Sequence, residues 1–289
     1  MTLLTHIPLD RVVETHLTVP ALDRGPEAPI ILGMMRDELE AAMRGCEQAP
    51  GYSVWQHCQD VYDTYLAVKV YARSGCLDSA PAGWRLPAWI SDPIVNKDEL
   101  ASSRSAREYL LWHDCGKPFC LEVDSEGRRH FPCHAEKSAE TWGRMRRVEL
   151  SKQWLEELLA AGPNFPECAK RWASYDIAQE RQVETLIRMD MDAHNLTAET
   201  LDEFSRRPEA VTLLLAAVAE VHANAKMFGG FDSPSFKIKI KHLDRRGRQV
   251  IDRIRHAATE RARAETIVSE LGYIPDYLLA PGAAANTGE

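Results

Sequence analysis

The sequence predicts a mostly α-helical protein that ends in a small basic appendage, a strand followed by a helix. Apolar residues recur at helical spacing through most of the chain from residue 53 to residue 227. The hydrophobic fraction of 45% and the charged fraction of 27% are typical of an ordinary soluble globular protein. At 289 residues, the chain is long enough to bury a sizeable core.

The first 49 residues are expected to form an irregular lead-in, because four prolines interrupt regular structure before residue 30. A clear amphipathic helix begins after Ser53, which is a good N-cap residue. Its apolar positions are Val54, Cys58, Val61, Tyr62, Tyr65 and Leu66. A loop rich in Pro, Gly and Ser then runs from Ser74 to about Asn96.

A second helix is expected from about Ala101, and Gly116 and Pro118 must end it. Residues 119–131 predict a short hairpin around Gly127. Helical patterns then occupy residues 134–149, 152–161, 179–194 and 209–227. The longest apolar run, residues 211–221, has the length of a core helix rather than of a membrane span.

The character of the sequence changes after Gly229 and Gly230. Residues 236–243 alternate apolar and basic side chains, which predicts a strand, and a helix from Gln249 to about Leu271 is expected to follow. The tail after Pro281 is too poor in apolar groups to pack and is expected to be disordered. The predicted organisation is therefore a lead-in (1–49), a helical domain (50–228), a basic appendage (229–280) and a tail (281–289).

The cysteines indicate the compartment. Seven cysteines, an odd number without paired CxxC spacing, fit a reducing environment better than a disulfide framework. The polar residues among the first apolar ones do not match a secretory signal. We therefore expect a cytoplasmic protein with no membrane partner, and the net charge of −8 argues against a general nucleic-acid coat.

The most informative feature is His113 followed by Asp114 at the end of an apolar helix. Such a pair is costly to bury unless something satisfies both groups. One divalent cation does so, because a neutral imidazole nitrogen and a carboxylate oxygen suit Mn, Fe, Ni or Zn. The alternative is a solvated pair at a helix end that Gly116 terminates.

Other histidines and acids lie on the neighbouring predicted helices. His57 is on the apolar face of the first helix, where the alternative is a satisfied core histidine. His134 opens a later helix, where the alternative is a cap or surface residue. Asp190 and His194 are four residues apart and share a helix face, with Asp192 between them. The alternative there is a helix with one solvated side.

Together these segments resemble the HD superfamily of metal-dependent phosphohydrolases, which orders its ligands as a helix His, a His-Asp pair and a downstream acid. The run at residues 110–118, with Gly127, Phe131 and His134 after it, is particularly similar to the HD module of bacterial poly(A) polymerase and CCA-adding enzymes. The resemblance covers residues 50–228 and implies an HD-type helical bundle. No nucleotidyltransferase head is found upstream, so nucleotide addition is not implied.

The resemblance implies His57, His113 and Asp114 as metal ligands, with Asp190 as the fourth. Asp192 and Glu220 remain alternatives for that last position. The ion would be Mn, Fe, Ni, Co, Zn or Mg, and the number of ions depends on whether His134 and Asp190 both bind.

The chemistry that the resemblance implies is hydrolysis by metal-activated water. Asp114, or a carboxylate near Asp190, would accept the proton of that water. Lys117 and His134 would face the substrate phosphate and offset its developing negative charge. The alternative for Lys117 is an exposed lysine in a turn.

A basic segment follows the helical domain. Residues 226–255 carry nine basic and three acidic residues, a local charge of 9 − 3 = +6. On a strand, Lys237, Lys239 and Lys241 would form a row of cations on one face. Such a row fits a phosphate-rich partner, and equally an edge strand that lysines protect from aggregation.

The sequence as a whole predicts metal-dependent hydrolysis of a phosphate ester on a nucleotide or a nucleic-acid end. One alternative is a phosphohydrolase of nucleoside triphosphates or small metabolites. Another is a catalytically silent HD-fold module that binds nucleic acid through residues 237–255.

Overall fold

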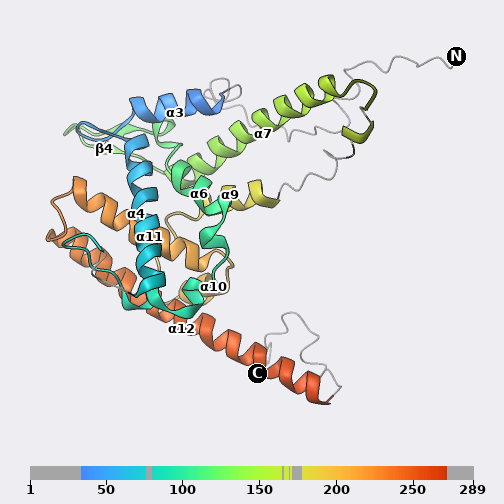
Figure 1. Cartoon of the computed structure of the whole chain (residues 1–289). Coiled ribbons are helices and arrows are strands. Elements are labelled where there is room, and N and C mark those ends of the chain that lie inside the picture. Colours follow the sequence, from blue (N-terminus) through green and yellow to red (C-terminus); the bar gives the residue numbers. More distant parts are fainter. Residues whose placement is uncertain (1–33, 76–79, 165, 169, 171–177, 272–289) are drawn as a thin grey trace, which may run out of the picture.

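The computed structural model of the chain describes residues 34–75, 80–164, 166–168, 170 and 178–271 (Figure 1). The fold is mostly helical, as predicted. Its α-helices are α3 (Arg36–Gly45), α4 (Val54–Ser74), α5 (Pro93–Asn96), α6 (Arg104–Trp112), α7 (His134–Ala161), α9 (Ala178–Arg188), α10 (Leu201–Ser205), α11 (Ala210–Met227) and α12 (Pro234–Leu271). Two antiparallel pairs, β1 (Glu47–Ala49) with β2 (Tyr52–Ser53) and β3 (Glu122–Val123) with β4 (Arg129–His130), complete the described fold.

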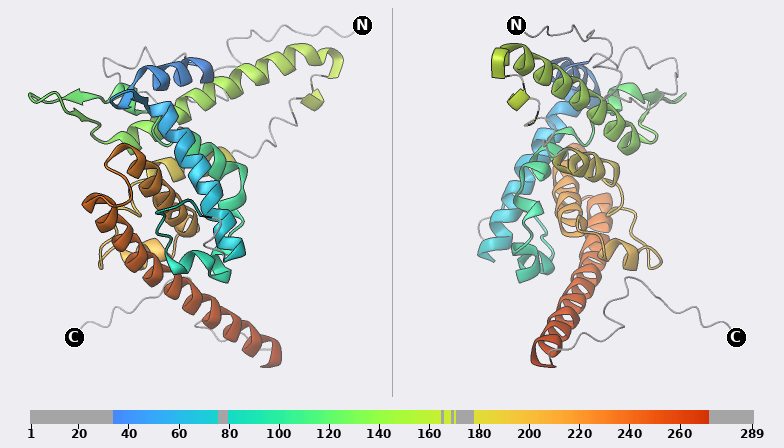
Figure 2. Two further views of the ribbon diagram at one scale, coloured as in Figure 1. Left: turned by 60° about the vertical axis from the view of Figure 1, so that its left-hand side comes forward. Right: turned by 90° about the vertical axis from the view of Figure 1, so that its right-hand side faces the viewer.

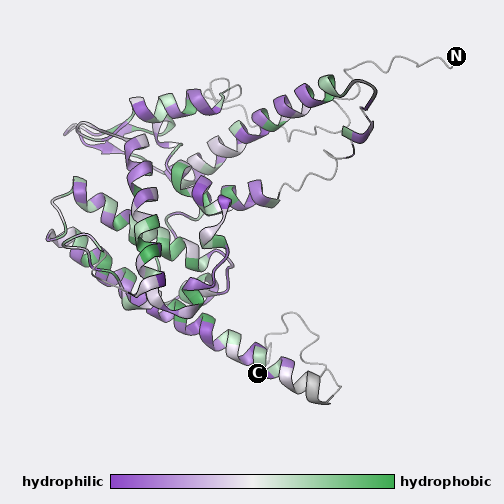
Figure 3. Ribbon diagram, viewed as in Figure 1, coloured by the Kyte–Doolittle hydropathy of each residue, from purple (hydrophilic) through white to green (hydrophobic). Residues whose placement is uncertain are grey.

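The centre of the molecule is the pair α4 and α11, which pack side by side (Figures 1 and 2). The predicted start of α4 is confirmed, since the Ser53 hydroxyl accepts a hydrogen bond of 3.2 Å from the Gln56 amide. The hydropathy colouring concentrates apolar residues along these two helices (Figure 3). Helix α11 is long and apolar enough to cross a membrane by length and composition alone, but 78% of it is buried within the fold, as in a core helix.

Helix α9 packs against both α6 and α7, and α6 packs on α4 beside this centre. Ser103 caps α6 by accepting from the Ala106 amide at 3.2 Å. The predicted hairpin is confirmed as β3 and β4, with Glu122 opposite His130. Its turn contains Gly127 at a φ of 77°, a conformation that favours glycine.

The predicted C-terminal strand is wrong, because residues 236–243 belong to the long helix α12. Phe236, Ile240 and Leu243 are buried, while Ile238 is 69% exposed. The apolar residues that alternate as they would in a strand therefore also follow helical spacing. Packing against α10 and α11 selects the helix. On a helix, Lys239 lies on the side opposite to Lys237 and Lys241, so the row of cations does not form.

Ion pairs fasten α12 to the body of the protein. Arg253 pairs with Asp202 at 2.5 Å, and Arg255 pairs with Asp92. Gly247 lies against the Trp89 ring so closely that a Cβ atom there would approach it to 2.4 Å. The basic segment is therefore explained in part by the docking of this helix.

Several expected boundaries also change. Residues 36–49 of the expected irregular lead-in form α3 and β1, while residues 1–33 and the expected tail at 281–289 lie outside the described residues. The two helices expected between residues 134 and 161 are one helix, α7. Helix α9 ends at Arg188, so the acids at 190 and 192 and the histidine at 194 lie in turns rather than on a helix.

A buried histidine in α11, His222, is packed among aromatic rings and has a hydrogen bond at each ring nitrogen. The His222 ring lies between Trp84 and Phe236, with centroid distances of 4.9 and 5.2 Å. Its Nδ1 donates to the Val218 carbonyl at 2.7 Å, and its Nε2 accepts from the Arg85 amide at 3.3 Å. Burial lowers the pKa of His222 from 6.5 to about 4.

We expect His222 to make the unfolding free energy fall as the pH drops from about 6.5 to about 4. In that window the unfolded chain binds a proton at this residue and the folded chain does not, so acid favours unfolding. The measurement is the pH dependence of chemical denaturation for the natural protein and for His222→Gln. The variant should be less stable at neutral pH and show a shallower slope, whereas an equal slope would contradict the assignment.

Candidate metal centre

Three buried side chains from two segments converge at the centre of the molecule. His57 is in the first turn of α4, and His113 and Asp114 follow the last turn of α6. Asp114 Oδ2 lies 3.5 Å from His57 Nε2 and 3.4 Å from His113 Nε2. One potential ligand atom from each residue lies within 4.8 Å of the others, and no residue of the three is more than 2% exposed.

These groups lack ordinary partners. Among the described residues, neither ring nitrogen of His57 has a hydrogen bond, nor does His113 Nε2 or Asp114 Oδ1. His113 Nδ1 donates to the Leu110 carbonyl at 2.9 Å, which leaves Nε2 directed at the cluster. Buried polar groups normally have hydrogen-bond partners, and leaving such a group without a partner is costly. Two imidazoles and a carboxylate are the donor set that a divalent transition ion prefers, so the residues fit such an ion.

The turn that carries His113 and Asp114 is fixed by its contact with α7. The Gly116 amide donates to the Ser138 hydroxyl at 2.9 Å, and Cys115 Sγ donates to the Ser138 carbonyl at 3.3 Å. A Cβ atom at Gly116 would lie only 2.3 Å from the Ser138 nitrogen. This close approach requires glycine and sets the position of the preceding pair.

Lys117 completes the turn and lies inside the site. Its side chain is 7% exposed, so the alternative of an exposed lysine is wrong. Its Nζ donates to Asp114 Oδ2 at 2.6 Å and to Gln48 Oε1 at 3.0 Å. The ammonium also lies 5.3 Å from the centroid of the Phe131 ring, a cation–π contact.

His134 forms the more open side of the cluster. Its Nε2 lies 3.7 Å from Asp114 Oδ1, and its Nδ1 donates to the Phe131 carbonyl at 3.1 Å. At 20% exposed, it is the most accessible of the side chains around Asp114. A substrate that approaches Asp114 past this side would therefore meet His134 first.

Burial and neighbouring charges set the protonation of these groups. Burial lowers the pKa of His57 to about 4, so its imidazole is neutral at pH 7. Burial alone would raise the pKa of Asp114, but Lys117 and His113 hold it well below its usual value. Burial likewise opposes a charged Lys117, yet Asp114 raises the pKa of its ammonium.

His113 differs from His57 in the direction of its pKa shift. Burial disfavours its charged form, but Cys58, Asp114 and Asp190 outweigh this effect and raise the pKa of His113 well above its usual value. A metal ligand must be a neutral imidazole, so an ion that binds here competes with a proton for His113.

Asp190 is near the cluster but is not one of its three members. It is 5% exposed, and its Oδ1 accepts a hydrogen bond of 2.6 Å from the Tyr109 hydroxyl. The Tyr109 ring packs edge-on against His113, with centroids 6.3 Å apart. Burial raises the pKa of Asp190, and the positive charge of His113 opposes this rise.

The two alternatives to Asp190 have other partners. Asp192 is 41% exposed at its side chain and pairs with Arg207 at 2.5 Å. Glu220 pairs with His194 at 2.7 Å. Burial alone would raise the pKa of the Glu220 carboxyl, but the neighbouring His194 lowers it below its usual value. Of the three acids, Asp190 is the one in a hydrogen-bonded pair with a residue that packs on His113.

We expect Asp190→Ala to weaken metal binding by about 10- to 100-fold, the usual effect of losing a group that supports a ligand. Asp192→Ala removes the same charge two residues away, at an outward position, and should change the dissociation constant less than about twofold. Titration of each metal-stripped variant with Zn²⁺ or Mn²⁺ measures the difference. Equal constants for both variants would exclude Asp190 from the centre.

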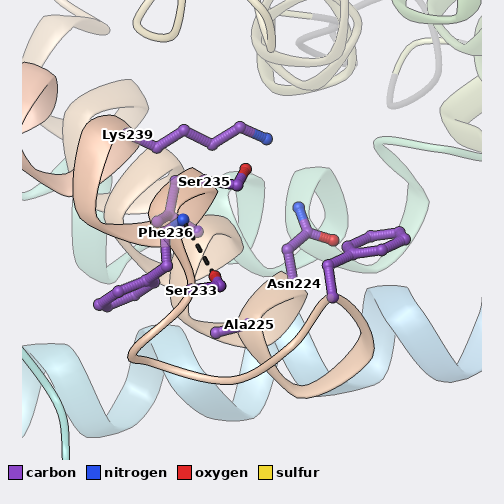
Figure 4. Close-up of a pocket in the computed structure, with 8 residues that line it drawn as sticks. Asn224, Ala225, Ser233, Ser235, Phe236 and Lys239 are labelled. Carbon is purple, nitrogen blue, oxygen red and sulfur yellow. Dashed lines mark hydrogen bonds between the residues drawn. The ribbon is translucent and has the colours of Figure 1, made fainter.

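The structure does not bring the predicted substrate lysines to this cluster. Lys237 pairs with Asp232 at 3.2 Å on the exposed start of α12. Lys239 lines a small pocket between α11 and α12 together with Asn224, Ser233 and Ser235 (Figure 4). His57, His113 and Asp114 do not line that pocket.

Sequence reasoning missed three residues that support the site. Tyr109 precedes His113 by four positions on α6, so its spacing was a readable signal. Gln48 and Ser138 contact Lys117 and Gly116 only through the tertiary fold, and no local pattern marks them.

No protein-family model, curated protein or solved structure matches this chain significantly.

Proposed function

We propose that the chain is a metal-dependent phosphohydrolase of the HD type, in which His57, His113 and Asp114 hold a divalent ion. Its substrate is a phosphate ester on a nucleotide or a nucleic-acid end. The observation that supports this most is the convergence of unpartnered nitrogen and oxygen atoms from α4 and from the turn after α6. The order of these residues along the chain agrees with the HD resemblance.

The bound ion supplies Lewis acidity, which makes water a nucleophile at neutral pH and polarises a phosphoryl oxygen. Asp114 remains ionised, because Lys117 and His113 stabilise its negative charge, and the same stabilisation makes its carboxylate a weak base while these cations stay beside it. Lys117 and His134 lie on either side of the Asp114 carboxylate, at 2.6 Å from Oδ2 and 3.7 Å from Oδ1. Both can donate to a phosphate that enters past His134.

The positions of the basic residues on α12 bear on the size of the substrate. A row of lysines would favour a polymer, but Lys237 and Lys239 lie on different sides of a helix. Arg253 and Arg255 are engaged in ion pairs with acids of the body. These observations favour the second candidate function, hydrolysis of a nucleoside triphosphate or small metabolite.

The test of the proposal combines elemental analysis of the purified protein with a panel of phosphomonoesters and phosphodiesters. We expect stoichiometric divalent metal, hydrolysis that chelation abolishes, and recovery when Mn²⁺ or Zn²⁺ is restored. If the protein binds no metal and hydrolyses none of these substrates but binds oligonucleotides, the chain is a nucleic-acid-binding module rather than an enzyme.

We expect Lys237→Gln, Lys239→Gln and Lys241→Gln together to leave the hydrolysis of mononucleotides unchanged, since none of these three described lysines forms an ion pair with Asp114. If these lysines touch a polymer, the log-log salt slope of oligonucleotide binding falls by roughly 0.7 to 0.9 per lost contact. We expect no such fall, because Lys239 lies on the opposite side of the helix from Lys237 and Lys241, so the three cations do not form one row. A reduced salt slope in the triple variant would instead support a nucleic-acid substrate.

A further inference from the structure

Lys117 is the closest partner of Asp114. Its ammonium nitrogen lies 2.6 Å from Oδ2, whereas the nearest imidazole nitrogens lie 3.4 and 3.5 Å from the same oxygen. The lysine side chain is 7% exposed, so water screens this contact little. The oxygen that faces both histidines therefore already has a cation beside it.

A divalent ion between His57, His113 and Asp114 would compete with that ammonium. Both cations require the same carboxylate oxygen, and two positive charges repel strongly in a buried site. Binding of the ion must therefore move the Lys117 ammonium away from Oδ2.

Gln48 offers the ammonium a second position. It is on β1 (Glu47–Ala49), shortly before the helix that carries His57, and its Oε1 accepts from the same Nζ at 3.0 Å. The Phe131 ring lies 5.3 Å from that nitrogen and accepts a cation on its face. An ammonium that leaves Asp114 can keep both of these contacts.

We infer that Lys117 is a built-in competitor of the metal ion and that Gln48 is the positioning residue that retains the displaced ammonium. This inference rests on the proposed function and adds to it a control of metal affinity. The displaced ammonium, still held by Gln48 and Phe131, is then available to the substrate phosphate. Metal binding thereby prepares the phosphate site.

The test is a double-mutant cycle on the metal-stripped full chain, titrated with Zn²⁺ or Mn²⁺ alone. Lys117→Met should tighten metal binding by about tenfold or more, because the competitor is gone. Gln48→Leu should weaken it by about fivefold, because the displaced ammonium has lost Asp114 and depends more on the Gln48 hydrogen bond than the ammonium beside Asp114 does. In the Lys117→Met background, Gln48→Leu should have no effect, because Gln48 acts only through the lysine.

Two controls accompany the cycle. Lys97→Met makes the same change of charge at an exposed lysine outside the cluster and should leave the dissociation constant unchanged. Thermal unfolding without metal should show a lower melting temperature for Lys117→Met, because Asp114 loses its closest partner. If that variant does not fold, Gln48→Leu still decides, since weaker binding supports the inference and unchanged binding overturns it.

The outcomes separate the inference from the proposed function. Natural protein that binds metal with the same constant as Lys117→Met overturns the competition and leaves the phosphohydrolase proposal intact. Binding that appears only in Lys117→Met supports the competition. No binding in any variant overturns both.

Discussion

Replacement of His113 and Asp114 together by alanine is expected to abolish both bound metal and hydrolysis. The double variant removes two of the three residues whose ligand atoms lie within 4.8 Å of one another. It also leaves the buried Lys117 ammonium without its carboxylate, so we expect a lower melting temperature. The helical circular dichroism spectrum should persist, because the core around α4 and α11 does not depend on this pair.

His57→Ala is the matched variant for this experiment. It removes the proposed ligand on α4 but keeps the ion pair between Asp114 and Lys117, so its stability should suffer less. His130→Ala, at an exposed position of the hairpin, is the control that should retain metal and activity. Full hydrolysis by the double variant after chelation and metal restoration would refute the centre.

Gly116→Ala is expected to damage the fold and the site together. The added Cβ atom would lie 2.3 Å from the Ser138 nitrogen, 2.5 Å from the Lys137 carbonyl carbon and 2.8 Å from the Ser138 Cα. These are backbone atoms of α7 that cannot rotate away, so the turn must shift. We expect a loss of about 1–3 kcal/mol of unfolding free energy, or more. Activity should fall as well, because the shift moves His113 and Asp114.

Gly45→Ala is the control for this substitution. No atom lies within 4 Å of a Cβ at Gly45, which ends α3. The same change there should raise stability by up to about 1 kcal/mol, because glycine is a poor helix residue. Chemical denaturation of both variants measures the contrast. Equal stabilities would mean that the approach of α7 to the turn is not tight.

The local parts of the fold were predictable from the sequence. The cap at Ser53, the end of α6 and the hairpin with Gly127 each depend on neighbouring residues, and each is confirmed. The prediction of a strand at residues 236–243 was wrong, because alternation over eight residues also satisfies helical spacing at Phe236, Ile240 and Leu243. Packing against α11 selects the helix over the strand, and the residues near 236–243 in the sequence do not reveal that packing.

The candidate site shows the same division. The grouping of His57, His113 and Asp114 was expected from the resemblance to the HD superfamily, and the structure brings these three together. The environment of Lys117 was not predictable, because Gln48 and Phe131 reach it from separate segments. A single sequence gives residue types and spacing, whereas the distance between such segments is a property of the fold.

The separation of the ligands along the chain has a consequence for folding kinetics. His57 and Asp114 are joined by a long loop of chain, so their contact requires an entropic cost of loop closure that local helices do not bear. We therefore expect the cluster to assemble late, after α4 and α6 have formed and docked. A metal that binds only the assembled cluster would then slow unfolding more than it speeds refolding, and would prolong the lifetime of the native state.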